Sequence, residues 1–169
     1  NAKQWATLDL LSEGRLTLTP IGGWQREEYE AFGIAFEERG RRLDEQLEIM
    51  QLAWRETPIH YEGEFYRFKD VYVMPKPVQP GGPQILIGGD RMSARVIRRI
   101  VRYGSGYTLT SPPDAAQLAR LADAMRSAGR DLAQLDTSGL VFPIFEDASS
   151  CADLARQARV LGRIVAQRS

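Results

Sequence analysis

The sequence has few of the residue types that build thiol, metal and acid–base sites. Among 169 residues there is one cysteine, Cys151, and one histidine, His60. A single cysteine excludes an internal disulfide and fits a reducing compartment, so we expect a cytoplasmic protein. The sequence shows no cluster of metal-ligand residues, no Ser-His-Asp set and no P-loop, and we predict no metal site. For His60 we expect a polar surface role rather than acid–base catalysis.

An excess of charge of either sign is also absent. Lys and Arg together number 22, as do Asp and Glu, so the formal net charge is zero. Binding to nucleic acids or to anionic membranes needs a basic excess, and we expect neither kind of partner. No apolar run approaches the roughly 20 residues of a membrane span, and the N-terminus lacks the apolar segment of a signal peptide. The composition, 43% hydrophobic and 26% charged, predicts one globular domain over residues 1–169.

What the sequence does have is a regular alternation of strand and helix patterns. The predicted strands cover residues 15–21, 84–87, 106–110 and 140–145. The predicted helices cover residues 3–11, 41–54 and 93–103, a segment that begins at Ser111, and a last segment that begins at Ser150. Alternating strands and helices predict an α/β fold with a parallel sheet. A doubly wound sheet and a (β/α) barrel both fit, and about four strand–helix units are half of a barrel.

Two parts of the chain depart from this alternation. The segment of about 57–80 is an insertion in which aromatic and polar residues alternate around Glu62-Gly63, which predicts a hairpin-like excursion. We expect its aromatic residues to pack over the barrel mouth or against a partner. The helix pattern at 3–11 carries Trp5, Leu8 and Leu11 on one face and begins without an N-cap signal, as expected for a chain cut within an element, an expression artefact or a short natural terminus.

The pair Gly88-Gly89 stands between a predicted buried strand and a predicted helix. Ligands of parallel α/β folds bind at the carboxyl ends of the strands, and a helix N-terminus there suits a phosphate. Glycine lets the backbone approach a phosphate closely, and Arg91 and Ser93 add donors. The alternative is that the glycines only make the turn. Asp90 would repel a phosphate at short range, and we expect it to cap the helix instead.

Four segments together carry a resemblance to a known family. They are LDLLSEGRLTL, GGWQREEYEAFGIAFEERGRRLDEQLEIMQLAW, YEGEFYRFKDVYVMPKPVQ and PQILIGG, in this order and spacing. From about Ala6 to Thr110 the chain resembles the bacterial luciferase-like family of flavin- and F420-dependent oxidoreductases, with the closer resemblance to its F420-dependent branch.

This resemblance implies a (β/α)8 TIM barrel, of which the chain would form a part, and hydride transfer between F420 or FMN and a small organic substrate. It also implies that Gly88 and Gly89 hold the cofactor phosphate, that Gly22, Gly23 and Trp24 run beside the cofactor, and that Thr110 lies near the phosphate or the substrate. Trp24 either walls the cofactor cleft or packs behind its loop. No catalytic residue can be assigned.

The chain also departs from the family pattern. The usual GVGVGW is TPIGGW at residues 19–24, and the usual DGW is Ser105-Gly106-Tyr107. The family's first three strand–helix units and its last strand have no counterpart, so a truncated, inactive barrel with a cofactor-binding or structural role is the alternative function. An open parallel sheet leaves two strand edges unpaired, and we therefore expect a homodimer or higher homo-oligomer. The arginines at 95, 98, 99 and 102 predict a solvated basic face, or else a contact with an anionic cofactor tail.

Overall fold

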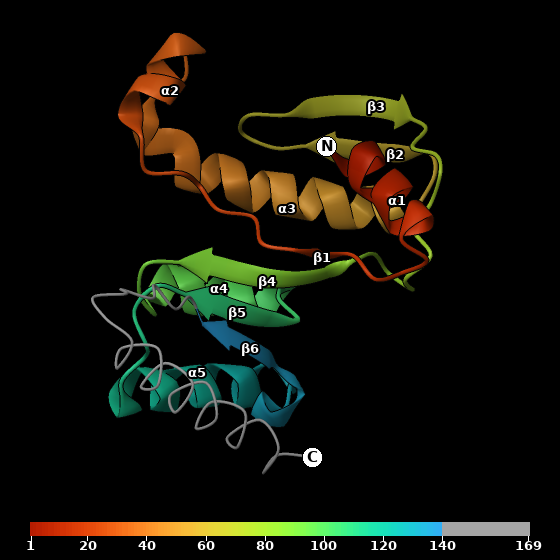
Figure 1. The fold of residues 1–169 in the computed structure, drawn as a ribbon. Helices are drawn as coiled ribbons and strands as arrows, with labels where there is room; N and C mark the ends of the chain where they lie inside the picture. Colours follow the sequence, from red (N-terminus) through yellow and green to blue (C-terminus); the bar gives the residue numbers. More distant parts are fainter. Residues whose placement is uncertain (140–169) are drawn as a thin grey trace, which may run out of the picture. The chain divides into compact units, whose positions relative to one another are not determined.

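Four parallel strands form the sheet that organises the chain (Figure 1). The order across the sheet is β1-β4-β5-β6, and every neighbouring pair is parallel. The strands are β1 (Thr17–Leu18), β4 (Gln84–Gly89), β5 (Gly106–Leu109) and β6 (Asp136–Gly139). The parallel α/β prediction is therefore confirmed. The computed structural model describes residues 1–139, so the predicted strand at 140–145, the predicted last helix and Cys151 lie outside the described residues.

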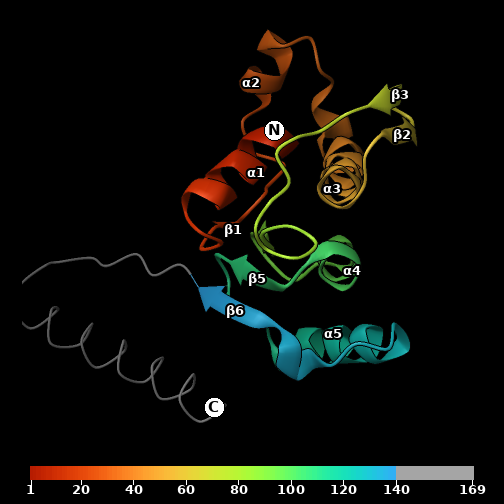
Figure 2. The same ribbon diagram turned by 90° about the vertical axis from the view of Figure 1, so that its right-hand side faces the viewer.

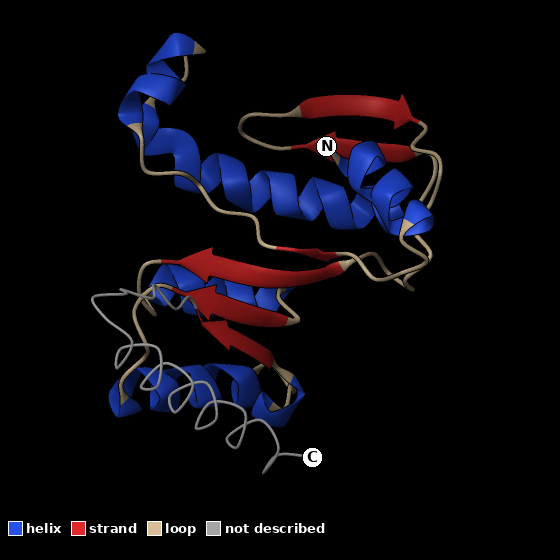
Figure 3. Cartoon of the chain, viewed as in Figure 1, coloured by secondary structure: helices blue, strands red, loops and turns tan. Residues whose placement is uncertain are grey.

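Helices connect the strands in the alternating manner predicted (Figure 3). The α-helices are α1 (Ala2–Leu11), α2 (Arg26–Ala31), α3 (Arg39–Arg55), α4 (Ala94–Tyr103) and α5 (Ala115–Ser127). Short 3₁₀ turns at Phe36–Glu38 and Leu132–Gln134 precede α3 and β6. None of the helices within residues 1–139 is long and apolar enough to cross a membrane.

The two faces of the sheet differ in burial: one packs against helices and the other is only half-buried. Ile85 and Ile87 of β4 and Tyr107 and Leu109 of β5 are buried in one core with residues of α3, α4 and α5. Leu86, Gly88 and Thr108 alternate with them and are half-buried. Figure 2 shows α4 and α5 on the same side of the strands. Because side chains alternate along a strand, one face is the helix-covered core and the other is the face that a barrel would turn inward.

The first strand is shorter than the pattern at 15–21 predicted. Only Thr17 and Leu18 pair with β4, opposite Gln84 and Ile85. Pro20 has no N–H for a strand ladder, and regular pairing ends before it. The prediction of a strand through Ile21 is therefore wrong at its carboxyl end, and the chain after Leu18 becomes a loop.

Helix α1 buries a face other than the predicted one. Leu8 and Leu11 are 45% and 74% exposed, whereas Ala6 and Asp9 are fully buried. The Asp9 carboxylate accepts hydrogen bonds from the backbone N–H of Val78 at 2.8 Å and of Gln79 at 3.0 Å, and from the Gln79 amide at 2.7 Å. A buried carboxylate needs such donors. The predicted apolar stripe was wrong because this contact with the segment before β4 sets the helix rotation.

Helix α5 begins later than predicted. Its N-cap is Asp114, whose carboxylate accepts from the Gln117 N–H at 2.7 Å while the Gln117 amide oxygen accepts from the Asp114 N–H at 3.0 Å. This reciprocal pair satisfies two helix-end donors, which the predicted cap Ser111 does not do. The Ser111 hydroxyl instead lies 3.3 Å from the carboxylate of Asp90.

The inserted segment forms the predicted hairpin, β2 (Ile59–Glu62) paired antiparallel with β3 (Arg67–Val71). Its turn is held by Glu45 of α3, whose carboxylate accepts from the backbone N–H groups of residues 64–66. The Tyr61 hydroxyl donates to Glu48 at 3.2 Å, and its pKa is raised by burial and by the nearby Glu48 charge. The hairpin therefore packs on the outer side of α3. His60 is exposed and accepts from the backbone N–H of Asp70.

Three of the four α4 arginines, Arg95, Arg98 and Arg102, are exposed as the solvated face predicted, whereas Arg99 is buried. The Arg99 guanidinium is 7% exposed; its Nε lies 2.6 Å from Asp44, and its Nη2 donates to the Gly40 carbonyl at 2.6 Å. Arg98 pairs with Asp44 at 3.4 Å and Arg102 with Glu48 at 2.6 Å. The prediction is wrong for Arg99, because Asp44 and the Gly40 carbonyl of α3 bind its guanidinium. Arg98, Arg99 and Arg102 thus pair with α3 carboxylates and join α4 to α3.

We expect Arg99→Ala to lower the free energy of unfolding by about 2 kcal/mol, because the half-buried Asp44 carboxylate and a helix carbonyl lose a charged donor. Arg98→Ala is the matched control: its side chain is 66% exposed, and the loss should stay below about 1 kcal/mol. Urea unfolding of both variants measures the difference. Equal losses of stability in the two variants would show that Arg99 does not stabilise the packing of α4 on α3 more than Arg98 does.

Candidate functional site

The loops that follow β1, β4 and β5 lie at one edge of the sheet. The three strands are parallel neighbours, so their carboxyl ends point the same way. In Figure 1 the arrowheads of β4 and β5 mark this edge. In parallel α/β folds the carboxyl edge is where ligands bind. All eight residues predicted to contact a cofactor belong to these loops or to the strand end itself.

Gly88 lets the loop after β1 pack onto the end of β4. A Cβ at residue 88 would lie far inside van der Waals contact with the Ile21 methyl and at 3.1 Å from the Thr19 methyl. At Gly89 a Cβ would meet Val96 at 3.2 Å and Leu109 at 3.5 Å. The space beside both glycines is therefore filled by neighbouring chain. Their direct structural role is close packing within and beside β4, which differs from the turn-making role considered as the alternative.

The start of α4 follows directly and carries the donors of this edge. The Ser93 hydroxyl accepts the Val96 N–H at 3.3 Å and is the N-cap, so the expectation that Asp90 caps the helix is wrong. The N–H groups of Ala94 and Arg95 belong to the first turn and have no carbonyl partner within the helix. Arg91 is 74% exposed on the turn just before. These groups make a positive helix end with free donors.

Asp90 joins the loops after β4 and β5. Its carboxylate accepts from the Thr110 hydroxyl at 2.9 Å, from Arg91 Nε at 3.2 Å and from the Ser111 hydroxyl at 3.3 Å. The hydrogen bonds from Thr110 and then Arg91 lower the pKa of Asp90 from its ordinary value. The backbone N–H of Ser111 donates to the Asp90 carbonyl at 2.9 Å. The carboxylate is thus held by the β5 loop, and Thr110 is engaged with it.

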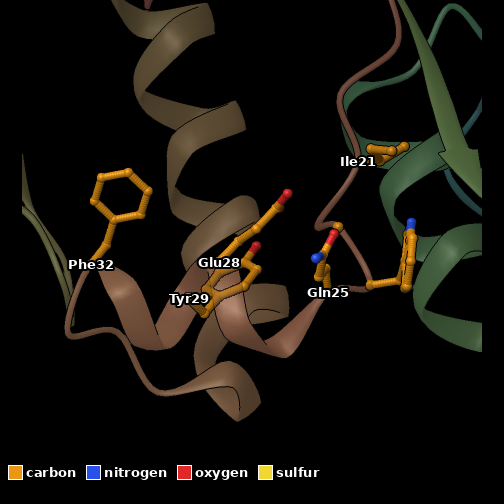
Figure 4. Close-up of a pocket in the computed structure, with 7 residues that line it drawn as sticks. Ile21, Gln25, Glu28, Tyr29 and Phe32 are labelled. Carbon is orange, nitrogen blue, oxygen red and sulfur yellow. The ribbon is translucent and has the colours of Figure 1, made fainter.

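A pocket of about 480 Å³ opens beside the loop after β1 (Figure 4). It is lined by Ile21, Gly23, Trp24, Gln25, Glu28, Tyr29 and Phe32. Figure 4 shows Glu28 and Tyr29 pointing toward the loop that carries Ile21 and Gln25, with Phe32 apart from them. The Tyr29 hydroxyl donates to the Gly22 carbonyl, and its ring meets Phe36 edge-on at 5.6 Å. Tyr29 therefore fixes the loop as one wall of the pocket.

Trp24 is 82% exposed, so it does not pack behind its loop. Of the two alternatives, only the one that turns it toward a cleft agrees with its position in the pocket. Phe32, at the other end of the pocket, is 81% exposed. Two large exposed aromatic rings and one carboxylate, Glu28, give this pocket an apolar wall with a single acidic group.

The structure brings the predicted residues together in two groups. Gly88, Gly89, Arg91, Ser93 and Thr110 surround Asp90 at the ends of β4 and β5. Gly22, Gly23 and Trp24 belong to the loop that lines the pocket.

Ile21 connects the two groups, since it lines the pocket and also lies against Gly88. Sequence reasoning missed Ile21 and Tyr29, whose partners come from other elements, and it misassigned Asp90. Over residues 1–139 no group of three or more His, Cys, Asp and Glu is placed to hold a metal ion.

Comparison with known proteins decides the family. The model of the luciferase-like monooxygenase family matches residues 1–163. The chain belongs to this family. The family motifs in the sequence ended at about Thr110, whereas the family match continues to residue 163.

Relatives of the chain differ in the cofactor that their names state. The FMNH(2)-dependent dimethylsulfone monooxygenase of Pseudomonas putida is 36% identical over 97 residues, which are 56% of this chain and 27% of that protein. The F420-dependent glucose-6-phosphate dehydrogenase of Segniliparus rotundus is 33% identical over 144 residues, or 80% of this chain and 42% of that protein. Luciferase-like relatives thus include both flavin- and F420-dependent enzymes.

Solved structures agree on the fold. Monooxygenase RslO1 from Streptomyces bottropensis superposes with a TM-score of 0.74 at 26% identity, covering 99% of this chain and 50% of that one. Such neighbours are TIM-barrel luciferase-like enzymes, so the part-barrel prediction is confirmed. The chain spans half or less of the length of these three relatives.

We expect Gly88→Ala to destabilise the protein by about 1–3 kcal/mol, because the new methyl overlaps Ile21. Ile21→Ala in the same chain should restore most of this loss. Ile21→Ala alone is the control and should cost less than about 0.5 kcal/mol, since Ile21 is 60% exposed. Chemical unfolding of the double-mutant cycle measures the coupling; additive losses would contradict a direct contact.

We expect Thr110→Val to raise the pKa of Asp90 toward its ordinary value, because the strongest hydrogen bond to the carboxylate is lost. A lowered native pKa stabilises the fold above the unfolded pKa, and this contribution disappears as the pH falls through the native pKa. The variant should therefore lose stability at neutral pH relative to the parent and converge with it in acid. Carboxyl NMR titration measures the pKa, with Ser111→Ala as a control expected to shift it less.

Proposed function

We propose that this chain forms part of an oxidoreductase that transfers hydride between F420 or FMN and a small organic substrate. The observation that carries the proposal is the family match over residues 1–163, together with the donor-rich strand edge beside an apolar pocket. F420 is slightly preferred, because the sequence segments resemble that branch more closely. The activity and substrate of the whole protein are part of this proposal.

The start of α4 fits the phosphate of either cofactor. The Ala94 and Arg95 N–H groups and the Ser93 hydroxyl hydrogen are available there, and the exposed Arg91 adds a charged donor. Asp90 is turned to Thr110 and Ser111, which limits its repulsion of an anion. Gly88 and Gly89 support this anchor indirectly, by letting the neighbouring chains pack tightly against the strand end.

The pocket beside Trp24 is the proposed place of the organic substrate and of the cofactor ring. Trp24 and Phe32 offer apolar surface for a flat or aliphatic group, and burying them against a ligand is favourable. Glu28 would orient a substrate through a hydrogen-bond donor or positive charge. Gly22 and Gly23 add no side chain to the loop that forms one wall of the pocket, and the Tyr29 hydroxyl holds this loop through the Gly22 carbonyl.

The bound cofactor would supply the hydride chemistry itself. The residues of this chain would bind and orient: the start of α4 would hold the phosphate, the Trp24 loop would exclude water, and Glu28 would position the substrate. No residue within 1–139 is assigned a proton-transfer role, and a catalytic residue stays unknown. The sheet edges at β1 and β6 have no further strand beside them among the described residues, so we also propose that a second copy completes the structure.

Native mass spectrometry of the full chain with FMN or with F420 tests both proposals. We expect a dimer or higher oligomer that carries one of the two cofactors, which would also identify the cofactor. Arg91→Gln should weaken binding about tenfold, as expected for a charge-assisted hydrogen bond to phosphate. Arg67→Gln is the matched control, because this arginine on β3 is 75% exposed and far from the strand edge in sequence.

A folded chain that binds neither cofactor would contradict the oxidoreductase proposal and favour the alternative, a barrel portion with a structural role. Binding that Arg91→Gln leaves unchanged would contradict the phosphate anchor alone. A folded monomer that binds its cofactor fully would contradict the proposed association. The three parts of the proposal therefore fail separately.

A further inference from the structure

A second cavity lies at the opposite end of the sheet, where β4 and β5 begin. Its volume is about 340 Å³. Its lining comes mainly from the end of α3, the segment before β4, the end of α4 and the start of β5, and includes Gln51, Trp54, Arg55, Gly82, Ser105 and Arg130. In Figure 1 this is the end away from the arrowheads of β4 and β5, where α3 and α4 also end. The proposed cofactor edge contributes no residue to it.

The charge of this cavity is one-sided. Its lining contains three arginines, Arg55, Arg102 and Arg130, and no aspartate or glutamate. The chain as a whole has equal numbers of basic and acidic residues, so such a lining is a local separation of charge. Guanidinium groups around a concave surface favour an anion. Arg102 is paired with Glu48, so the positive field here comes mainly from Arg55 and Arg130.

Two of the three arginines are held in place by the fold. Arg130 donates to the carbonyls of Ile100 at 2.8 Å, Val101 at 2.6 Å and Gly104 at 2.7 Å, at the carboxyl end of α4. Arg102 is paired with Glu48 at 2.6 Å. Their positions are therefore set before any ligand arrives, which lowers the entropy that binding would cost.

Of the three arginines in this cavity, Arg55 is the one without a partner among the described residues. It is the last residue of α3, is exposed, and makes no hydrogen bond or ion pair with the residues 1–139. The carboxyl end of α3 would attract it, but Lys76 already donates there, to the carbonyls of Ala53 at 2.7 Å and of Glu56. The negative ends of α3 and α4 are thus occupied by Lys76 and Arg130, and the charge of Arg55 is left for a ligand.

Neutral donors and a rigid wall complete the cavity. The Ser105 hydroxyl accepts the Ile85 N–H at 3.4 Å, so its own hydrogen is free to donate. The Gln51 amide uses one hydrogen toward the Tyr103 carbonyl at 3.3 Å and keeps the other. Gly82 lies flat against the Trp54 ring, where a Cβ would overlap the ring atoms, and this contact fixes the loop before β4.

We infer that this cavity binds a phosphate-type oxyanion, either free phosphate or a phosphomonoester, at a site separate from the proposed cofactor anchor. Arg55 would be its principal charged ligand, with Ser105 and Gln51 as neutral donors. This anion site is independent of the proposed oxidoreductase activity. The volume of about 340 Å³ leaves room for a small organic group on the phosphate.

NMR titration of the full ¹⁵N-labelled chain with inorganic phosphate tests this inference. Sodium chloride keeps the ionic strength constant. We expect saturable shifts of the amides of Gly82, Gly104 and Ser105. Arg55→Gln should weaken this binding about tenfold, and Arg67→Gln, which changes another exposed arginine, on the hairpin, should leave it unchanged.

The same titration separates the two phosphate sites. Shifts at Ala94 and Arg95 report the proposed cofactor anchor and should be weakened by Arg91→Gln, whereas the response of Gly82 and Ser105 should not. Glycerol phosphate in place of phosphate identifies the source: tighter binding supports a phosphomonoester and equal binding supports free phosphate. Absence of saturable shifts at Gly82, Gly104 and Ser105, equal shifts with chloride alone, or an Arg55→Gln variant that binds as the parent does would each overturn the inference.

Discussion

A buried guanidinium holds the helix layer on which the rest of the structure depends. Arg99 of α4 reaches Asp44 and the Gly40 carbonyl of α3, and both contacts measure 2.6 Å. Burying a charge is costly unless it is paired and hydrogen-bonded, so this contact permits only one relative placement of α3 and α4. Those helices cover Ile85 and Ile87 of β4, and the carboxyl end of β4 in turn carries the donor groups of the candidate site.

Close approach of neighbouring chain to strand glycines is the second constraint, and it acts on the sheet itself. At Gly106 a Cβ would overlap the Asp136 carbonyl, and at Gly88 it would overlap Ile21. Both glycines occupy positions where a larger residue would push a neighbouring strand or loop away. Ile21 contacts the end of β4 at Gly88 and also lines the Trp24 pocket, so this tightly packed edge joins the two groups of the candidate site.

The sequence pattern correctly predicted those features of the fold that depend on residues close together in the chain. The apolar spacing of α3 placed Leu43, Leu47 and Trp54 correctly in the core, and strand–helix alternation predicted the parallel sheet. Predictions were wrong where a distant residue decides the outcome. The hydrogen bond that Asp9 accepts from the Val78 N–H turns α1 toward the segment before β4. Asp90 accepts a hydrogen bond from Thr110 and does not cap α4 as expected. In the site, the strand-end glycines were identified, but Tyr29 and Ile21 depend on contacts across elements, which spacing along the chain does not reveal.

Ile21 contacts both groups of residues in the candidate site. One side chain rests on the end of β4 and also forms a wall of the pocket. If a molecule in the pocket displaces Ile21, the packing at Gly88 changes, and with it the affinity of the α4 end for an anion. Reciprocity then requires that an anion bound at α4 alter the affinity of the pocket by the same factor. A single isoleucine would thereby make the occupancy of the pocket depend on what the α4 end has bound.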